Sequence, residues 1–339
     1  MLLEPGFLSR LEQLALLSRR LYAGQQKGER RSTRRGASVE FADYRNYVPG
    51  DDLRRVDWNT FARLERLFLK LFVAEEELTV HLLLDTSRSM AFGDPTKLHY
   101  AQQVAAALGY IALTGFDRVT VTALGGSPPG AAGTPRTLPA LRGRNQALRL
   151  FQFLDDLAPP EGLGNQGNTA PPQGLGGQGN TVPSRGWGGQ DDSVPPQSWG
   201  GQGGPPTNLG RALHDYARTT RSTGLVIFLS DLLDAHCHAG LRALAARRFD
   251  VTLIHLLDRT EVNPQLVGDL RLVDCETGET REVSINQYLL GRYRRALAEY
   301  CGELTALCTR YGMNYIRTTT DVPFDELVLR TLRARGVLR

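Results

Sequence analysis

Short apolar runs alternate with amphipathic stretches along most of the chain after residue 77. The runs at 80–84 and 224–229 are almost wholly apolar, which is typical of strands buried on both faces of a parallel sheet. Similar patterns predict further strands at 118–123, 251–257 and 313–317.

Between these runs, apolar residues recur at the spacing of helices. The pattern predicts helices at 97–113, 148–154, 209–216, 241–247, 293–311 and 323–332, and a β-hairpin between 266 and 283. Strands that alternate with helices are typical of a doubly wound sheet. We therefore expect residues 77–339 to form an α/β domain around a mostly parallel sheet.

The first 76 residues have a different pattern. Apolar residues between 7 and 21 predict an amphipathic helix, which we expect to pack on the rest of this segment. An extended stretch at 38–47 and an apolar run at 67–73 follow, separated by a turn at 49–52. Residues 1–76 are thus predicted to form a small mixed α+β module.

A polar tract from 158 to 206 interrupts the larger domain. It repeats with a period of twelve residues, as in Gly162-Leu163-Gly164 and Gly174-Leu175-Gly176. Its Gly, Pro, Gln and Asn content gives too little apolar surface to offset the cost of ordering, so we expect a disordered insertion. Trp187 and Trp199 could make the tract an adhesive element, although expansion without function is favoured.

Composition agrees with a protein of the cytoplasm. The chain has 339 residues, of which 41% are hydrophobic, enough for about two domains with sizeable cores. No apolar stretch approaches the roughly 18 residues that cross a bilayer, and the N-terminus is broken too early for a signal peptide. The four cysteines lack the spacing of a zinc site or a disulfide framework, which suits a reducing compartment.

The net charge of +4 comes from the N-terminal part of the chain, and the densest basic run lies at 27–35. Such a run could contact phosphates, so nucleic-acid binding is one alternative function. However, the run contains no aromatic residue to stack on a base, and short basic loops are more often solvated links. We therefore expect no nucleic-acid partner.

Oxygen-bearing side chains follow the two most apolar strands. Asp85, Ser87 and Ser89 come directly after the first, and Asp231 follows the second, while Thr207 lies near a predicted helix start. Because the carboxyl ends of parallel strands meet at one edge of a sheet, these side chains can converge there. Carboxylates and hydroxyls are hard ligands that suit Mg²⁺ or Mn²⁺ and do not suit zinc. In the alternative interpretation the serines only cap backbone groups.

This order of residues resembles the metal-ion-dependent adhesion site (MIDAS) of von Willebrand factor A-like domains. The five residues that match the motif are Asp85, Ser87, Ser89, Thr207 and Asp231. The resemblance implies a von Willebrand factor A-like fold with a Mg²⁺ (or Mn²⁺) ion, held so that a partner's acidic side chain can complete its coordination.

The segment upstream resembles the signature of a bacterial family called domain of unknown function 58. The residues that carry the resemblance are Glu40, Arg45, Tyr47, Pro49, Gly50, Asp51, Arg54, Asp57 and Trp58. These residues could form a binding surface, but we favour a structural role in which Arg45 or Arg54 pairs with a carboxylate and Trp58 anchors a core. The resemblance implies a MoxR-type AAA+ ATPase, or its client, as the partner.

We therefore expect a metal-dependent protein-interaction module that acts as an adaptor in the assembly or maturation of other proteins, and not an enzyme. The rival interpretation is a phosphatase with Asp85 as nucleophile. That chemistry usually needs a second acid two residues on, where this chain has Ser87, and a cationic group at the phosphate, for which no segment stands out.

Overall fold

The computed structural model describes eleven stretches of the chain. They are residues 6–7, 9–15, 41–49, 51, 53–72, 79–115, 117–125, 135–158, 208–234, 236–276 and 279–334. The chain divides into two compact units, Arg20–Leu78 and a larger unit of Met1–Arg19 with Thr79–Arg339. Each unit is described by itself.

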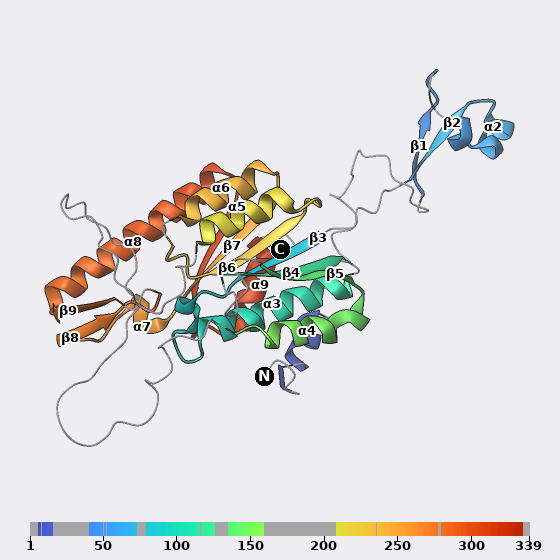
Figure 1. Ribbon diagram of the computed structural model, residues 1–339. Coiled ribbons are helices and arrows are strands. Elements are labelled where there is room, and N and C mark those ends of the chain that lie inside the picture. Colours follow the sequence, from blue (N-terminus) through green and yellow to red (C-terminus); the bar gives the residue numbers. More distant parts are fainter. Residues whose placement is uncertain are drawn as a thin grey trace. The chain divides into compact units, whose positions relative to one another are not determined.

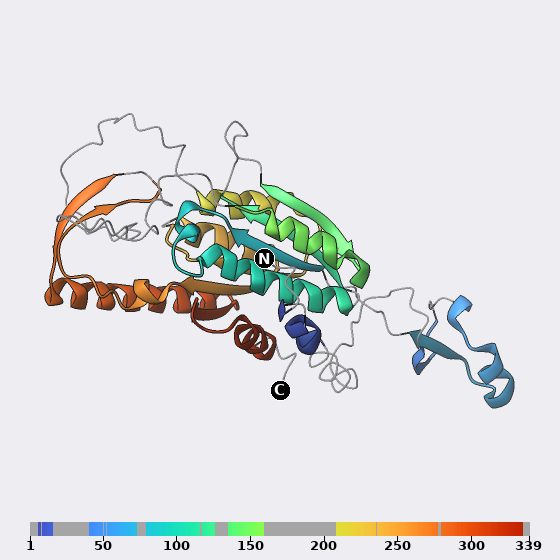
Figure 2. The same ribbon diagram turned by 90° about the horizontal axis from the view of Figure 1, so that it is seen from below.

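The first residues of the chain belong to the larger unit, not to the small module in which we expected them. Leu11 and Leu14 are buried, and the ring of Phe7 lies 5.0 Å from that of Phe324 near the other end of the sequence. Figure 2 shows this blue segment beside the red helix α9 (Phe324–Ala334). The apolar stripe of the segment thus finds its partner in a helix that is distant in sequence.

The small unit is built on an antiparallel pair of strands, β1 (Phe41–Asn46) and β2 (Phe68–Phe72). A 3₁₀ turn, η1 (Leu53–Arg55), and a short helix, α2 (Trp58–Leu64), connect them. Helix α2 was not predicted; Asp57 starts it by accepting hydrogen bonds from the backbone N–H groups of Asn59 and Thr60. The small unit thus contains both strands and a helix, but its helix is α2 and not the one expected at residues 7–21.

The larger unit contains a six-stranded sheet with the order β10-β7-β6-β3-β4-β5 (Figure 1). The five parallel strands are β3 (Thr79–Asp85), β4 (Arg118–Leu124), β6 (Leu225–Ser230), β7 (Asp250–Leu257) and β10 (Asn314–Thr319). This confirms the predicted α/β architecture with a mostly parallel sheet.

An antiparallel edge strand, β5 (Arg136–Arg142), completes the sheet and was not predicted. Its sequence lacks the alternation of apolar and polar residues that predicts a strand. Only Leu138 and Leu141 are buried, and they are three residues apart. It also contains Pro139, which is tolerated at an edge where one side of the strand has no ladder to complete.

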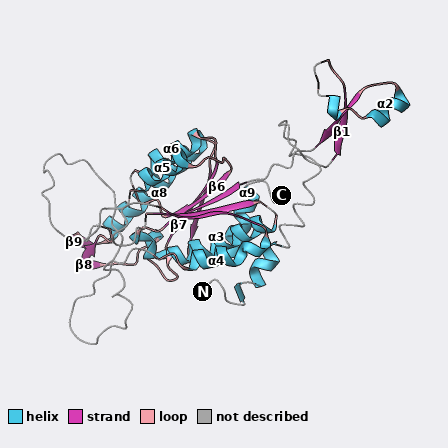
Figure 3. Ribbon diagram, turned by 45° about the vertical axis from the view of Figure 1, so that its right-hand side comes forward, coloured by secondary structure: helices cyan, strands magenta, loops and turns pink. Residues whose placement is uncertain are grey.

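Helices cover both faces of the sheet (Figure 3). On one face lie α3 (Lys97–Thr114), α4 (Ala147–Asp155) and α9; on the other lie α5 (Leu209–Thr219), α6 (Cys237–Ala246) and α8 (Gln287–Arg310). The shorter elements are η2 (Arg88–Ala91), η3 (Arg144–Gln146) and α7 (Arg259–Val262).

Successive side chains of the central strand β3 point alternately to the two helical layers, because side chains along a strand alternate between the faces of the sheet. Leu83 belongs to the apolar cluster beneath α5, α6 and α8. Leu82 faces α3 at Gly109, where an added Cβ would lie 3.2 Å from the Leu82 side chain. Both leucines are fully buried, so β3 is the centre of the core.

The predicted hairpin is present as β8 (Gly268–Val273) paired with β9 (Thr280–Ile285).

Three predicted segments lie outside the described residues. They are residues 277–278 of the hairpin turn, the basic run at 27–35 and residues 159–206 of the repeat tract. The segment before the tract is anchored, because the side-chain amide of Gln102 donates to the carbonyls of Leu154 and Leu157 at 2.7 and 2.8 Å. Among the described residues, no helix combines the length and apolarity needed to span a bilayer.

Two buried histidines should make the larger unit sensitive to acid. Burial lowers the pKa of His81, on β3, and of His255, on β7, to about 4. The unfolded chain protonates both near pH 6.5, so stability should fall as the pH drops from 6.5 towards 4, by up to about 3 kcal/mol for each histidine. Urea unfolding between pH 7.5 and pH 4 measures this loss.

The variant His81→Gln is the matched control, since glutamine does not titrate and can still bond the Tyr216 hydroxyl, which lies 2.7 Å from His81 Nδ1. Its stability should depend less steeply on pH than that of the natural protein. Equal pH slopes for the two proteins would contradict the assignment.

Candidate functional site

The site lies at the point where the direction in which successive strands are added to the sheet reverses. After β3 the chain adds β4 on one side, and it later adds β6 on the other side of β3. The parallel register aligns Leu84 of β3 with Leu229 of β6, so the residues that follow both strands emerge together at one edge. Open α/β sheets bind their ligands at such a switch point.

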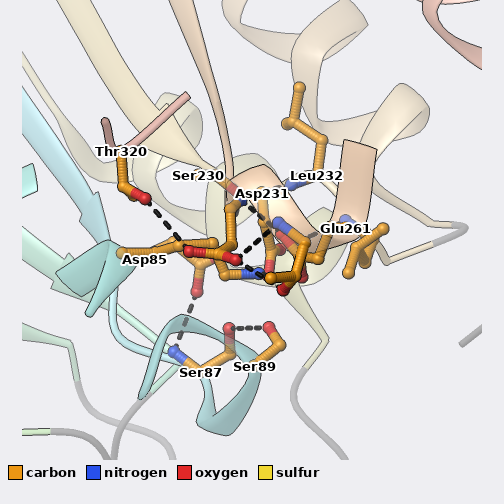
Figure 4. Close-up of polar contacts among 12 residues, drawn as sticks. Asp85, Ser87, Ser89, Ser230, Asp231, Leu232, Glu261 and Thr320 are labelled. Atoms are coloured by element: carbon orange, nitrogen blue, oxygen red, sulfur yellow. Dashed lines mark hydrogen bonds and ion pairs between the residues drawn. The ribbon is translucent and has the colours of Figure 1, made fainter. Parts of the chain in front are cut away.

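Asp85 ends β3 and is completely buried. Its Oδ1 accepts a hydrogen bond from the Ser87 backbone N–H at 2.9 Å, and its Oδ2 accepts one from the Ser230 hydroxyl at 2.6 Å (Figure 4). Burial, together with the nearby charge of Asp231, nevertheless raises the pKa of Asp85 to about 7. Hydrogen bonds therefore hold the carboxylate in position, while burial and the charge of Asp231 oppose its ionisation.

Ser87 and Ser89 bring two hydroxyl oxygens to the same place, 3.0 Å apart. Ser87 precedes η2, yet its side chain makes no capping hydrogen bond, so the interpretation in which the serines only cap backbone does not describe it. Ligands 2.0–2.1 Å from a Mg²⁺ ion in octahedral geometry lie about 2.9 Å from each other along an edge. The spacing of the two hydroxyls is compatible with one such edge.

Asp231 follows β6 and is paired with a buried lysine at the start of α3. Lys97 Nζ lies 2.8 Å from Asp231 Oδ2 and 2.6 Å from Glu261 Oε1, and its side chain is fully buried. Burial alone would raise the pKa of Asp231, but the charge and hydrogen bond of Lys97 outweigh it and lower that pKa. Burial likewise opposes the charge of Lys97, yet the two carboxylates raise its pKa above the ordinary value.

Glu261 is fixed by the helix it belongs to. Asp258 caps α7. The Glu261 side chain in turn accepts a hydrogen bond from the Asp258 backbone N–H at 2.7 Å, which completes a capping box. Burial raises the pKa of Glu261, although the charge of Lys97 opposes this. Thr320, just after β10, donates to Asp258 at 3.1 Å, so four strand ends contribute to the network.

The structure thus brings together four of the five predicted ligands, Asp85, Ser87, Ser89 and Asp231. Thr207 lies outside the described residues. The chain enters α5 from the same edge of the sheet, because the Leu209 backbone N–H donates to Asp234, three residues beyond Asp231, at 2.7 Å. Within the described part of the chain, no group of three or more His, Cys, Asp or Glu side chains is arranged to hold a metal.

The signature residues belong to the small unit, where several of them stabilise local structure. Arg45 binds both oxygens of Asp51, at 2.8 and 2.9 Å, and the Tyr44 hydroxyl donates to Asp57, the residue that caps α2. These contacts confirm the expected pairing of Arg45 with a carboxylate.

Trp58 was expected to anchor a core, and this was wrong. Its side chain is 57% exposed at the start of α2, where its ring and that of Phe61 form a T-shaped pair with centroids 6.1 Å apart. Pro49 and Arg54 are exposed and Tyr47 is half-buried, whereas Glu40 and Gly50 lie outside the described residues.

A family model described as "Protein of unknown function DUF58" matches residues 43–300. The chain belongs to the DUF58 family. An uncharacterized protein of Mycobacterium tuberculosis and one of Mycobacterium bovis are each 26% identical over 340 residues, covering 99% of this chain and 92% of theirs. A Mycobacterium avium protein, also uncharacterized, is 29% identical over 129 residues, covering 38% of this chain and 76% of its own.

Among solved structures, the conserved hypothetical protein BatB from Bacteroides thetaiotaomicron matches with a TM-score of 0.38 and 12% identity, covering 76% of this chain and 99% of its own. An aerotolerance-related membrane protein from Bacteroides fragilis matches with a TM-score of 0.39 and 15% identity, covering 76% of this chain and 98% of its own.

Sequence patterns did not reveal the residues of this DUF58 protein that surround the predicted ligands. Lys97 begins an apolar helix and resembles an ordinary solvated lysine in the sequence, while Glu261 resembles a capping residue. The available signal for Ser230 was its position beside Asp231 at the end of an apolar strand. For Lys97 the signal was weaker: it stands at the start of a helix in which most other residues are apolar.

Removing the buried ammonium should strongly destabilise the larger unit. In Lys97→Met the carboxylates of Asp231 and Glu261 would lose their shared cation, and breaking a buried pair in this way costs about 3–5 kcal/mol. Denaturant unfolding of the full chain measures the loss. The control is Arg211→Met, which removes an 82% exposed partner of Asp215 and should change the unfolding free energy by less than about 0.5 kcal/mol. Similar losses in the two variants would show that Lys97 is not the central cation.

Proposed function

We propose that this DUF58 protein is a metal-dependent protein-interaction module with a von Willebrand factor A-like domain and a MIDAS-type Mg²⁺ or Mn²⁺ site. The ligands would be Asp85, Ser87, Ser89, Thr207 and Asp231. The observation that carries the proposal is the convergence of four of them at the switch point of the sheet, with the two serine hydroxyls 3.0 Å apart. All of these donors are hard oxygens, which Mg²⁺ prefers.

The charges of the buried network support a divalent ion. Asp85, Asp231 and Glu261 carry three negative charges when ionised, and Lys97 neutralises one of them. The remaining two charges match one Mg²⁺ or Mn²⁺. An ion beside Asp85 would also offset the burial and the charge of Asp231, which together raise the pKa of that carboxyl to about 7.

Protein oxygens alone would not complete the coordination of such an ion. Octahedral Mg²⁺ usually keeps water in positions that the protein leaves open, and a partner's Asp or Glu can replace that water. Following the family resemblance, we propose a MoxR-type AAA+ ATPase or its client as the partner, and an adaptor role in the assembly or maturation of other proteins. A partner that consumes ATP implies the cytoplasm, where the four cysteines, all free, would stay reduced.

The contacts of Lys97 argue against the rival phosphatase. Lys97 is a cationic group bonded to Asp231 that the sequence did not reveal, and a cation at the site would suit phosphoryl chemistry. However, its ammonium is fully buried and already bonded to two carboxylates, so it is poorly disposed to bind a phosphate. We therefore propose a binding module and not an enzyme. The basic run at 27–35, on which the alternative of nucleic-acid binding depends, lies outside the described residues.

Titration of the metal-free protein with Mg²⁺ or Mn²⁺ tests the site. Asp85→Ala should abolish the binding heat, because it removes the carboxylate at the centre of the ligand set. Asp215→Ala, which changes an exposed carboxylate on α5, should bind like the natural protein. Circular dichroism checks that both variants are folded. Unchanged affinity in folded Asp85→Ala would sink the assignment.

Pull-down of the tagged protein from its native cell, with and without chelator, tests the partner. Capture of the ATPase or its client should need metal and should weaken in Asp231→Asn. Neutralising Arg30, Arg31, Arg34 and Arg35 should matter much less. If the arginines dominate, and binding falls steeply with salt while chelator has no effect, an electrostatic role is correct instead.

A further inference from the structure

The tip of the β8–β9 hairpin reaches the candidate site from 187 residues away in sequence. The Ser89 backbone N–H donates to Glu276 Oε1 at 3.3 Å, and Arg88 Nη1 donates to the Glu276 carbonyl at 3.1 Å. Ser89 is also one of the two serines whose hydroxyls meet at the proposed metal edge. An acidic side chain of the chain itself is therefore attached to the loop that carries two of the proposed ligands.

The burial of Glu276 is unusual for this hairpin. Most residues of β8 and β9 are exposed or half-exposed, yet Glu276 at the tip is only 5% exposed. The tip is shaped for this position, because Asp274 accepts a hydrogen bond from the Glu276 backbone N–H at 2.8 Å, and the Asp274 N–H donates to Glu279 at 2.8 Å. The hairpin thus presents one carboxylate inwards.

In the described part of the chain, the carboxylate of Glu276 forms no ion pair, and the bond that it accepts from Ser89 is long. The Arg88 guanidinium lies nearby but bonds the Glu276 backbone carbonyl and not its carboxylate. Burying a carboxylate without a cation is costly, so such an arrangement calls for a positive charge nearby. The proposed Mg²⁺ site, whose ligand set includes the hydroxyl of the same Ser89, would supply that charge.

We propose that Glu276 is a tethered acidic ligand, which takes the position at the metal that a partner's acidic side chain would otherwise fill. This inference rests on the proposed function. The hairpin then acts as a competitor for the partner, which must present an acidic loop of its own and displace the tip of the hairpin. The docking surface for the partner is the part of the Arg88–Ser89 loop that Glu276 now covers.

Cys275 provides a natural reporter of this displacement. It is half-buried beside Glu276, whereas Cys237, Cys301 and Cys308 are buried in the core. Modification of Cys275 by a thiol reagent, located by mass spectrometry of the full-length protein, therefore measures how often the hairpin lifts.

Two substitutions at Glu276 separate its charge from its hydrogen bond. In Glu276→Ala the tip loses both, so Cys275 should react faster even without metal. In Glu276→Gln the amide oxygen can still accept the Ser89 N–H, so labelling without metal should stay close to that of the natural protein. Glu282→Gln, at an exposed position of β9, is the control for a charge change in the same hairpin.

The decisive measurement is the effect of Mg²⁺ on labelling. At ten times the dissociation constant, the metal should slow labelling of Cys275 by up to about tenfold in the natural protein and in Glu282→Gln. It should have little effect in Glu276→Gln. Mg²⁺ that binds in calorimetry but leaves labelling of the natural protein unchanged would overturn the tethered ligand alone. If calorimetry finds no Mg²⁺ binding in the natural protein, the proposed function and this inference both fall.

Discussion

The buried contact of Lys97 with Asp231 and Glu261 is the interaction on which the candidate site depends. It joins the first turn of α3 to the segments that follow β6 and β7, over sequence separations of 134 and 164 residues. An ammonium in this position is stable only because both carboxylates lie within hydrogen-bonding distance, and each carboxylate in turn depends on the ammonium. The pair therefore fixes the relative position of three elements and the charge of the site together.

The topology of the sheet explains why this contact can form. Strand β3 lies in the middle of the sheet, and the strands that flank it come from opposite directions along the chain. Side chains that follow β3 and β6 meet with little steric competition, because the connections leave on different faces. The remaining contacts, from the Ser230 hydroxyl to Asp85 and from Thr320 to Asp258, use the ends of the neighbouring strands in the same way.

Much of the sheet could be predicted from sequence, because its central strands are short, apolar and separated by periodic helices. The predicted strands at 80–84 and 224–229 correspond to β3 and β6, and the ligands expected after them do converge. The features that could not be predicted from the sequence are those that depend on tertiary contacts. The strand β5 has no alternating pattern, the first helix finds its partner in α9, and Trp58 is exposed because α2 offers it no core.

The polar network of the site also depends on tertiary contacts that the sequence does not reveal. Lys97 and Glu261 are 164 residues apart, and neither their residue types nor their spacing indicates that they form an ion pair. Glu276 is a similar case: hairpin turns are commonly acidic and exposed, and only the fold shows that this one is turned inwards.

The anchoring of the chain on both sides of the repeat tract has a consequence for how the protein can vary. Gln102 holds the segment that ends near Leu157, and Asp234 holds the start of α5, so both ends of the intervening stretch are fixed to the folded domain. Doubling the length of a flexible stretch between fixed ends costs only about 0.6 kcal/mol. We therefore expect that the gain or loss of whole twelve-residue units would leave both anchored ends, and the edge of the sheet beside them, unchanged.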